Sequence, residues 1–166
     1  VTVRSPATLS NLGSGFDVFG MALREPFDEI EARRIPGHDV VIEAVEGWGA
    51  ESITTAAERN SAGVAAMSVL AQANADFGVA IRIKKGIRPA SGIGSSGASA
   101  AGGACAANLL LDKPLRPEEL VFSAAKAEQT TSGSFHADNV GPAVMGGFTI
   151  IKSYDPFEIL RVDPPR

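Results

Sequence analysis

The sequence feature that most constrains the fold is the run PASGIGSSGASAAGGACAANLLL at residues 89–111, which carries no charged side chain. Most of it is Gly, Ala and Ser, so it is too weakly apolar to span a membrane. Residues 95–111 predict a helix that ends at Lys113-Pro114. Gly92 and Gly94 allow the preceding backbone to turn sharply and to approach a ligand. The run therefore predicts a glycine turn that opens a closely packed helix.

The other predicted elements surround this helix in a mixed order. Strands are expected at 1–5, 27–35, 39–45, 79–85 and 146–153, helices at 54–77 and 116–130, and a loop rich in Ser, Asn and Gly at 6–22. Strands and helices do not alternate regularly. The pattern indicates one α/β domain of the α+β type, a mixed-sheet two-layer sandwich.

Composition excludes several partners and settings. The formal net charge is −4, so a nucleic-acid partner is disfavoured. No predicted segment spans or targets a membrane, so we expect no membrane partner. The only cysteine, Cys105, cannot form an internal disulfide, and this favours a reduced, cytoplasmic setting.

The residues 92–97 read Gly-Ile-Gly-Ser-Ser-Gly, a literal G-x-G-x-x-G. The dinucleotide fingerprint needs a strand before it and an acid at the end of the next strand, whereas Asp112 here ends a helical run. A Walker loop needs a lysine after the glycine, and none is present. A protein-kinase glycine loop lies between two strands, whereas this one opens a helix. All three templates are therefore disfavoured.

A fourth interpretation is a phosphate site at the helix N-terminus. Ser95 and Ser96 lie where free N–H groups and the helix dipole favour an anion. A serine hydroxyl there can also bind a phosphate-bound Mg²⁺. The alternative is a serine N-cap on a closely packed helix. The glycine stretch alone leaves both open.

The longer motif Pro89-x-x-Gly92-Ile93-Gly94-Ser95-Ser96 resembles the nucleotide loop of the GHMP kinases, a superfamily that includes the homoserine kinases. This resemblance implies a fold like the second domain of ribosomal protein S5 and ATP as the cofactor. The residues that it implies for ATP binding are Asn60, Pro89, Gly92, Ile93, Gly94, Ser95, Ser96 and Gly97. Asn60 would lie near the adenine, although it could equally be a polar residue on a helix face.

Two flanking segments resemble homoserine kinases in particular. The first, SPATLSNLGSGFDVFGMAL at 5–23, places an amide and a carboxylate in one glycine-rich segment. Such groups can hydrogen-bond a hydroxyl and pair with an ammonium group. The resemblance implies that Asn11 approaches the homoserine hydroxyl and that Asp17 binds the amino group. Without it, the segment reads as a polar loop.

The second segment, AEQTTSGSFHADNVGPAVMGGF at 127–148, contains a further polar cluster that could alone be turn chemistry. The resemblance implies that Glu128 and Ser96 hold Mg²⁺ and that His136, Asp138 and Asn139 line the acceptor site. An asparagine cannot accept a proton, so catalysis would rest on alignment and charge stabilisation. Asp138 stays open as a displaced base. The predicted catalytic residues are thus Asn11, Asp138 and Asn139.

The resemblance covers residues 1–153, which we expect to be the N-terminal, nucleotide-binding domain, with 154–166 the start of a linker to a C-terminal domain absent from this chain. The expected activity is ATP-dependent phosphorylation of L-homoserine on the route to threonine. Another small-alcohol kinase, of shikimate or mevalonate type, is one alternative. A non-catalytic nucleotide-binding or interaction fragment is another. A homodimer is an expected assembly.

Overall fold

The computed structural model describes residues 1–133 and 135–163. Within these ranges the strands are β1 (Thr2–Leu12), β2 (Gly15–Ile35), β3 (Val40–Gly47), β4 (Gly78–Lys85), β5 (Phe148–Tyr154) and β6 (Phe157–Val162). The α-helices are α1 (Ser61–Gln72), α2 (Ser95–Asn108), α3 (Pro117–Ser132) and α4 (Val140–Met145), and two short 3₁₀ turns cover Ala50–Ser52 and Ala57–Arg59. Together they form a mixed α/β domain.

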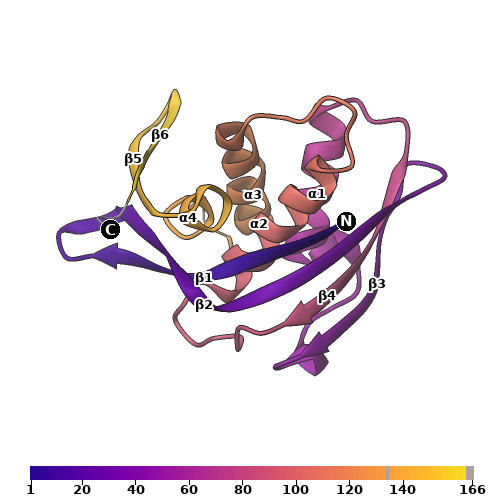
Figure 1. The fold of residues 1–166 in the computed structure, drawn as a ribbon, viewed down its shortest axis with the longest axis horizontal. Helices are drawn as coiled ribbons and strands as arrows, with labels where there is room; N and C mark the ends of the chain where they lie inside the picture. Colours follow the sequence, from indigo (N-terminus) through magenta and orange to yellow (C-terminus); the bar gives the residue numbers. More distant parts are fainter. Residues whose placement is uncertain (134, 164–166) are drawn as a thin grey trace.

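The strands form one mixed sheet in the order β3-β4-β2-β5-β6, with β1 paired to β2. Only β3 and β4 run parallel among these pairs. The 21-residue β2 connects the two ends of the sheet, because it pairs with β4 in its second half and with β5 in its first. Figure 1 shows the helices gathered on one face of this sheet. The predicted two-layer α+β sandwich is confirmed.

Helix α2 lies at the centre of the packing because its side chains are small. A Cβ on Gly102 would lie 2.3 Å from Cδ1 of Ile30 in β2, and one on Gly103 would lie 2.3 Å from the carbonyl oxygen of Ala62 in α1. Any larger residue at these positions would push α2 away from the sheet or from α1. The closely packed helix predicted from composition is therefore present.

Segment 6–22, predicted as a loop, is instead the end of β1 and the start of β2. Thr8 pairs with Ala22, Leu9 with Met21 and Ser10 with Gly20. Its polar, glycine-rich composition is a poor strand signal. Backbone pairing between the two strands supplies the order that local propensity does not.

Three other elements differ from the sequence expectation. The helix expected at 54–77 covers only Ser61–Gln72. It begins there because the side chain of Asn60 accepts hydrogen bonds from first-turn N–H groups of α1, and Asn74, with φ +50°, lies just past its end. Helix α4 was not predicted, and neither was β6, which pairs with β5 inside the segment expected to begin a linker. Residues 164–166 of that segment lie outside the described residues. The domain boundary stays a prediction.

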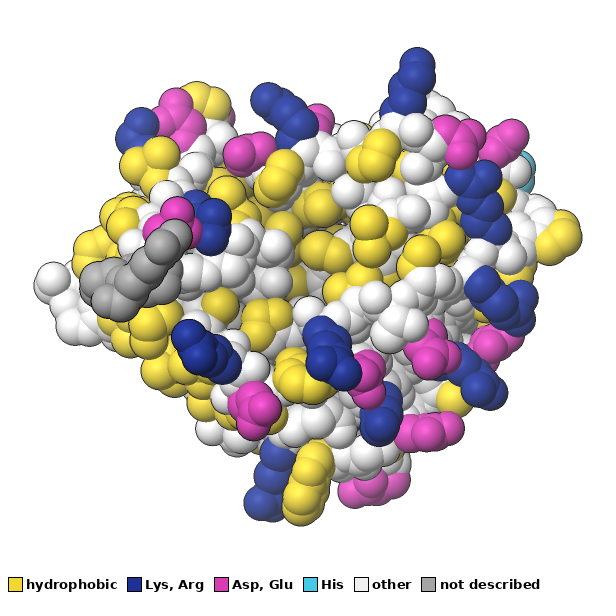
Figure 2. Space-filling view, viewed as in Figure 1, with side chains coloured by type: hydrophobic (Ala, Val, Ile, Leu, Met, Phe, Trp, Pro, Cys, Tyr) yellow, Lys and Arg dark blue, Asp and Glu magenta, His cyan; other side chains and the backbone are white. Residues whose placement is uncertain are grey.

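The surface carries both signs of charge. On the face in Figure 2, acidic and basic side chains are interspersed among hydrophobic ones, which fits the small net charge. None of the helices in the described ranges is long and apolar enough to cross a membrane.

Candidate functional site

The glycine turn ends at the first residue of α2. Gly92 has φ +77° and Gly94 φ +71°, both in the left-handed region, and Gly94 is the N-cap of α2. A Cβ at Gly94 would lie 2.1 Å from Oγ1 of Thr8, whereas Gly92 has open space around it. Glycine is therefore needed at position 94 for space and conformation, and at position 92 for conformation alone.

Gly94, and no serine, is the N-cap of α2, and no side chain in the described part of the chain caps this helix, so the alternative of a serine N-cap does not describe it. The Ser95 hydroxyl donates to the carbonyl of Ile87 at 3.1 Å, and the Ser96 hydroxyl donates to Glu128 at 2.7 Å. The N–H groups of the first turn therefore remain for a ligand, and the helix dipole makes this end attractive to an anion.

A cavity of about 340 Å³ opens in front of this turn. Its walls come from the glycine turn, the end of β4 and the start of α1: Ile53, Asn60, Ser61, Ile83, Lys85, Pro89, Ala90, Ser91, Gly92, Gly94, Ser95, Ser96 and Ser99. The volume is in the range of small-ligand pockets, which combine apolar walls with a few placed polar groups. The structure thus places most of the predicted ATP residues around one cavity.

The remaining predicted ATP residues, Ile93 and Gly97, are not among the residues that line this cavity. The side chain of Ile93 packs against Ala7, Ile87 and Ala98. Gly97 is buried, and a Cβ there would lie 3.2 Å from Cβ of Asn139. Asn60 is the buried N-cap of α1 and also lines the cavity, so it is not a polar residue on an exposed helix face, and its position near the adenine stays a prediction.

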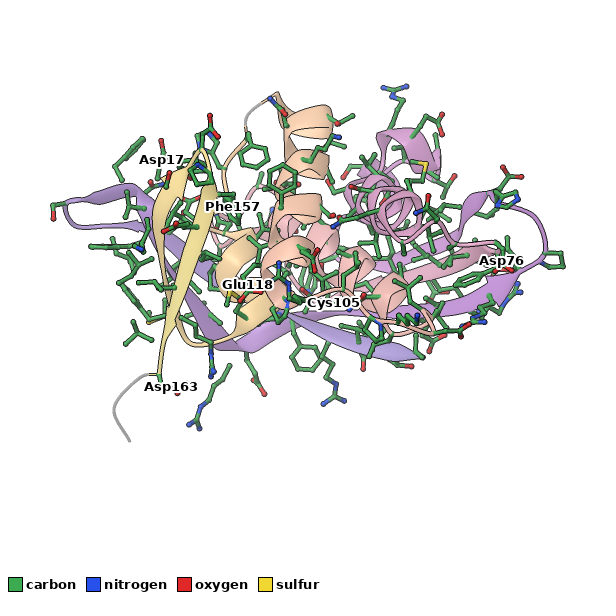
Figure 3. All side chains as sticks on the ribbon, turned by 90° about the horizontal axis from the view of Figure 1, so that it is seen from above. Asp17, Asp76, Cys105, Glu118, Phe157 and Asp163 are labelled. Carbon is green, nitrogen blue, oxygen red and sulfur yellow. The ribbon has the colours of Figure 1, made fainter. Side chains whose placement is uncertain are left out.

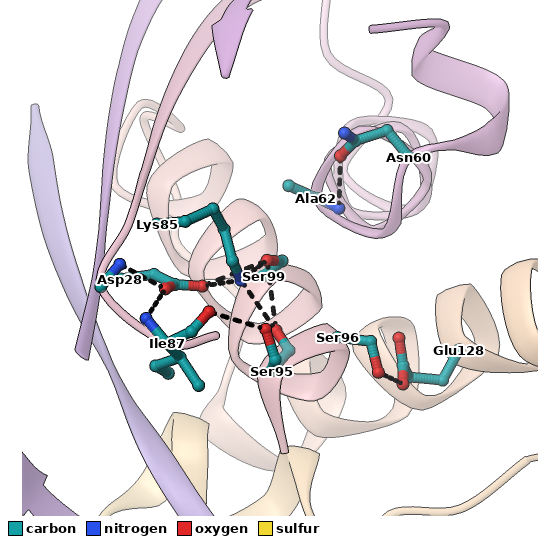
Figure 4. A network of polar contacts seen from close by, with 10 residues as sticks. Asp28, Asn60, Ala62, Lys85, Ile87, Ser95, Ser96, Ser99 and Glu128 are labelled. Carbon is teal, nitrogen blue, oxygen red and sulfur yellow. Dashed lines mark hydrogen bonds and ion pairs between the residues drawn. The ribbon is translucent and has the colours of Figure 1, made fainter. Parts of the chain in front are cut away.

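A buried ion pair between Lys85 and Asp28 is bonded to the first turn of α2. It was not predicted from the sequence. Nζ of Lys85 pairs with the Asp28 carboxylate and donates to the carbonyl of Ser95 at 3.1 Å and to Oγ of Ser99 at 2.8 Å (Figure 4). Asp28 also accepts from the backbone N–H groups of Gly86 and Ile87, each at 3.0 Å. Together these contacts tie β2 and the end of β4 to the first turn of α2.

Burial and the ion pair shift the pKa of Lys85 in opposite directions. The side chains of Lys85 and Asp28 are 1% and 0% exposed. Burial lowers the pKa of Lys85, and the Asp28 carboxylate partly offsets this. A signal for the pair did exist: Val79, Ile81, Ile83 and Lys85 alternate along β4, so the lysine falls on the buried face.

The side chains of the two predicted Mg²⁺ ligands are hydrogen-bonded to each other at the N-terminus of α2. Ser96 lies in its first turn, and Glu128 comes from α3, as Figure 4 shows. Burial raises the pKa of Glu128, while hydrogen bonds from Ser96 and Ser61 and the charge of Lys85 lower it. Within the described ranges no three His, Cys, Asp or Glu residues cluster as a metal site. The pair offers two oxygen-bearing side chains, which suits a Mg²⁺ bound chiefly by phosphates and water.

On the other side of the turn, three predicted substrate residues lie together. Oδ1 of Asn11 accepts from the backbone N–H of Asp17 at 2.8 Å, and both residues have φ +56°. Nδ1 of His136 lies 3.3 Å from Oδ1 of Asp17. The hydroxyl of Tyr154 donates to the Asp17 carbonyl at 2.9 Å, which places Asp17 beside the β5–β6 hairpin in Figure 3. Asp17 and His136 are both partly exposed, so a ligand can reach them.

Asp138 and Asn139 precede α4. Asp138 is 2% exposed, and its carboxylate accepts the N–H of Asn139 at 3.1 Å. The Asn139 amide lies against Gly94 and is held by two hydroxyls of β1, those of Thr8 and Ser10. Sequence reasoning did not single out these hydroxyls, because it expected that segment to be a loop. Gly94 lines the cavity and lies against Asn139, and Asn139 is linked to Asn11 through the hydroxyl of Ser10.

Sequence comparison matches residues 60–147, just over half of the chain, to the family described as GHMP kinases N terminal domain. The chain belongs to the GHMP kinases. The matched region includes the glycine turn, α2, Glu128 and Asn139, and the resemblance read from these motifs is confirmed.

Curated relatives of this GHMP kinase chain carry the name homoserine kinase. One from Methanococcus maripaludis is 46% identical over 98% of this chain and 53% of its own length. One from Halobacterium salinarum is 49% identical over 92% of this chain and 48% of its own length. The chain therefore spans about half the length of the curated relatives it matches.

Solved structures agree with this assignment. A crystal structure of homoserine kinase from Cytophaga hutchinsonii has a TM-score of 0.91 and 34% identity, covering 99% of this chain and 52% of its own. Mevalonate kinase from Methanococcus jannaschii, at 16% identity and a TM-score of 0.73, shares the fold.

Proposed function

We propose that this chain is the nucleotide-binding part of an enzyme that transfers the γ-phosphoryl group of ATP to the side-chain hydroxyl of L-homoserine. The observation that carries the proposal is the position of Gly94. On one side of it lie the uncapped N-terminus of α2 and the cavity. On the other side lies Asn139, which the hydroxyl of Ser10 links to the Asn11–Asp17 segment. A phosphate bound at the helix would therefore be next to an acceptor bound at that segment.

Each group has a role that follows from its chemistry. The first-turn N–H groups of α2 would bind the phosphates, and Asp17 would pair with the substrate ammonium group. The amides of Asn11 and Asn139 would orient the hydroxyl. Neither amide accepts a proton, so the hydroxyl proton would pass to the phosphate or to solvent. Phosphoryl transfer depends mainly on positioning and electrostatics, which such an arrangement supplies.

Ser96 and Glu128 would hold Mg²⁺, since both offer oxygen atoms beside the phosphate end of the cavity. When bound, the ion neutralises charge on the phosphates. We also propose that the enzyme acts in the cytoplasm on the route to threonine, and that the half absent here supplies the rest of the active site.

The test uses the complete polypeptide that the gene encodes. ADP release is measured with L-homoserine, mevalonate and shikimate as separate acceptors. Turnover with homoserine alone is expected. Turnover with another alcohol would replace the acceptor, and nucleotide binding without any turnover would contradict the enzyme proposal.

Two variants separate the proposed roles. Ser96→Ala should weaken Mg²⁺–ATP binding and leave homoserine binding unchanged. Asp17→Asn should raise the KM for homoserine by about 10- to 100-fold, the loss expected for a charged hydrogen bond, and leave nucleotide binding unchanged. Asp76→Asn is the matched control, because Asp76 is exposed at the opposite end of the molecule from Asp17 (Figure 3). Equal loss of both ligands in both variants would contradict these roles.

A further inference from the structure

Thr8 connects the glycine turn to Asn139. Its backbone N–H donates to the carbonyl of Ile93 at 3.1 Å. Its hydroxyl donates to Oδ1 of Asn139 at 2.8 Å, across 131 positions of sequence. The side chain is 0% exposed and fills the space that a Cβ on Gly94 would need. One buried residue of β1 thus contacts both halves of the site.

The hydroxyl of Thr8 also determines which way the Asn139 amide faces. With Oδ1 accepting from Thr8, the Nδ2 group is directed to Oγ of Ser10 at 2.9 Å. Ser10 precedes Asn11, whose Nδ2 donates to the same hydroxyl at 3.3 Å. Without the Thr8 hydroxyl, the amide would lose the donor that distinguishes its oxygen from its nitrogen. Both amides of the proposed acceptor site would then be less well oriented.

We propose that Thr8 is a positioning residue that sets the Asn139 amide and the Gly94 turn relative to each other. The inference rests on the proposed function, because the quantity that it sets is the alignment of phosphate and acceptor. Misalignment of reacting groups by about 1 Å can cost about 100-fold in rate. Removing the Thr8 hydroxyl should therefore lower kcat far more than it changes the KM for ATP or for homoserine.

The experiment compares Thr8→Val with Thr8→Ser in the complete polypeptide. Valine keeps the shape and removes the hydroxyl, whereas serine keeps the hydroxyl. We expect Thr8→Val to lower kcat by about tenfold or more with both KM values little changed, and Thr8→Ser to restore most of the rate. Thr149→Val is the matched control, because Thr149 is equally buried in β5 and its hydroxyl bonds only weakly, at 3.4 Å, to the carbonyl of Gly20.

Three results would overturn the inference: an unchanged kcat in Thr8→Val, no rescue by Thr8→Ser, or an equal loss in Thr149→Val. A wild-type protein without homoserine turnover would instead contradict the proposed function. In that case the side-chain amide resonances of Asn139, followed by NMR, still decide the inference. They should shift in Thr8→Val and not in Thr149→Val. Unshifted resonances in Thr8→Val would overturn it.

Discussion

The buried pair of Lys85 and Asp28 gives the sharpest stability prediction. Replacing Lys85 by Met leaves the Asp28 carboxylate buried with two backbone N–H donors, the Ser99 hydroxyl and no cation. Removing one partner of a buried ion pair costs about 3–5 kcal/mol. For a chain of this size, each kcal/mol lowers Tm by roughly 2–4 °C, so the expected loss is roughly 6–20 °C.

The assay is thermal and urea unfolding of the wild type, Lys85→Met, Asp28→Asn and the double variant. Removing both charges leaves no unpaired ion, so the double variant should lose less stability than the sum of the two single variants. Lys152→Met is the control, since Lys152 and Glu158 form a half-exposed pair at 2.8 Å, and such pairs contribute about 1 kcal/mol or less.

Two results would refute this reasoning. The first is a Lys85→Met protein that unfolds within about 1 kcal/mol of the wild type, the contribution expected of an exposed pair. The second is a double variant whose loss of stability equals the sum of the two single losses.

The Lys85→Met variant also tests the link between the ion pair and the candidate site. Lys85 donates to the carbonyl of Ser95, so Lys85→Met should weaken nucleotide binding by loosening the first turn of α2.

Three further predictions concern the turn and its surroundings. Gly92→Ala should cost about 1–2 kcal/mol in unfolding free energy from its positive φ alone, whereas Gly94→Ala should cost more and abolish nucleotide binding, because its Cβ would overlap Thr8; denaturant unfolding and calorimetry measure both. Glu128→Gln should raise Tm at pH 7, since burial raises the pKa of Glu128 and disfavours its charge, while weakening Mg²⁺-dependent binding; an unchanged or lowered Tm would contradict this. Burial raises the pKa of Cys105 to about 11 from 9.0, so the folded thiol keeps its proton longer than the unfolded one, and its contribution to stability should be lost as pH rises from about 9 to 11; a Cys105→Ala protein, unfolded over the same pH range, should show a flatter profile.

Short-range patterns in the sequence were enough to predict the glycine turn and the helix after it. Two glycines, two serines and an alanine-rich run determine backbone conformation within a few residues, and the structure has Gly94 at the position just before the first residue of α2. Strand β4 was predicted because its alternation is regular. The motifs at 5–23 and 127–148 also gave the candidate residues Asn11, Asp17 and His136, which lie together in the structure.

Short-range sequence patterns gave the wrong prediction for residues 6–22. Local propensity describes a polar loop, but the segment pairs with itself as β1 and β2 and so brings Thr8 and Ser10 against Asn139. Strand pairing depends on partners elsewhere in the chain, which outweigh local preference. The position of the acceptor side of the site therefore could not be read from composition.

Residue types and local turns were thus determined by the sequence alone, because they depend on sterics between near neighbours. Which polar groups share a buried space was decided only by the fold. Asp28 and Lys85 are 57 positions apart in the sequence, and Thr8 and Asn139 are 131 apart. Both pairs nevertheless lie against the N-terminal end of α2. Buried polar groups must find partners when water is excluded, and only the packed chain determines which partners are within reach.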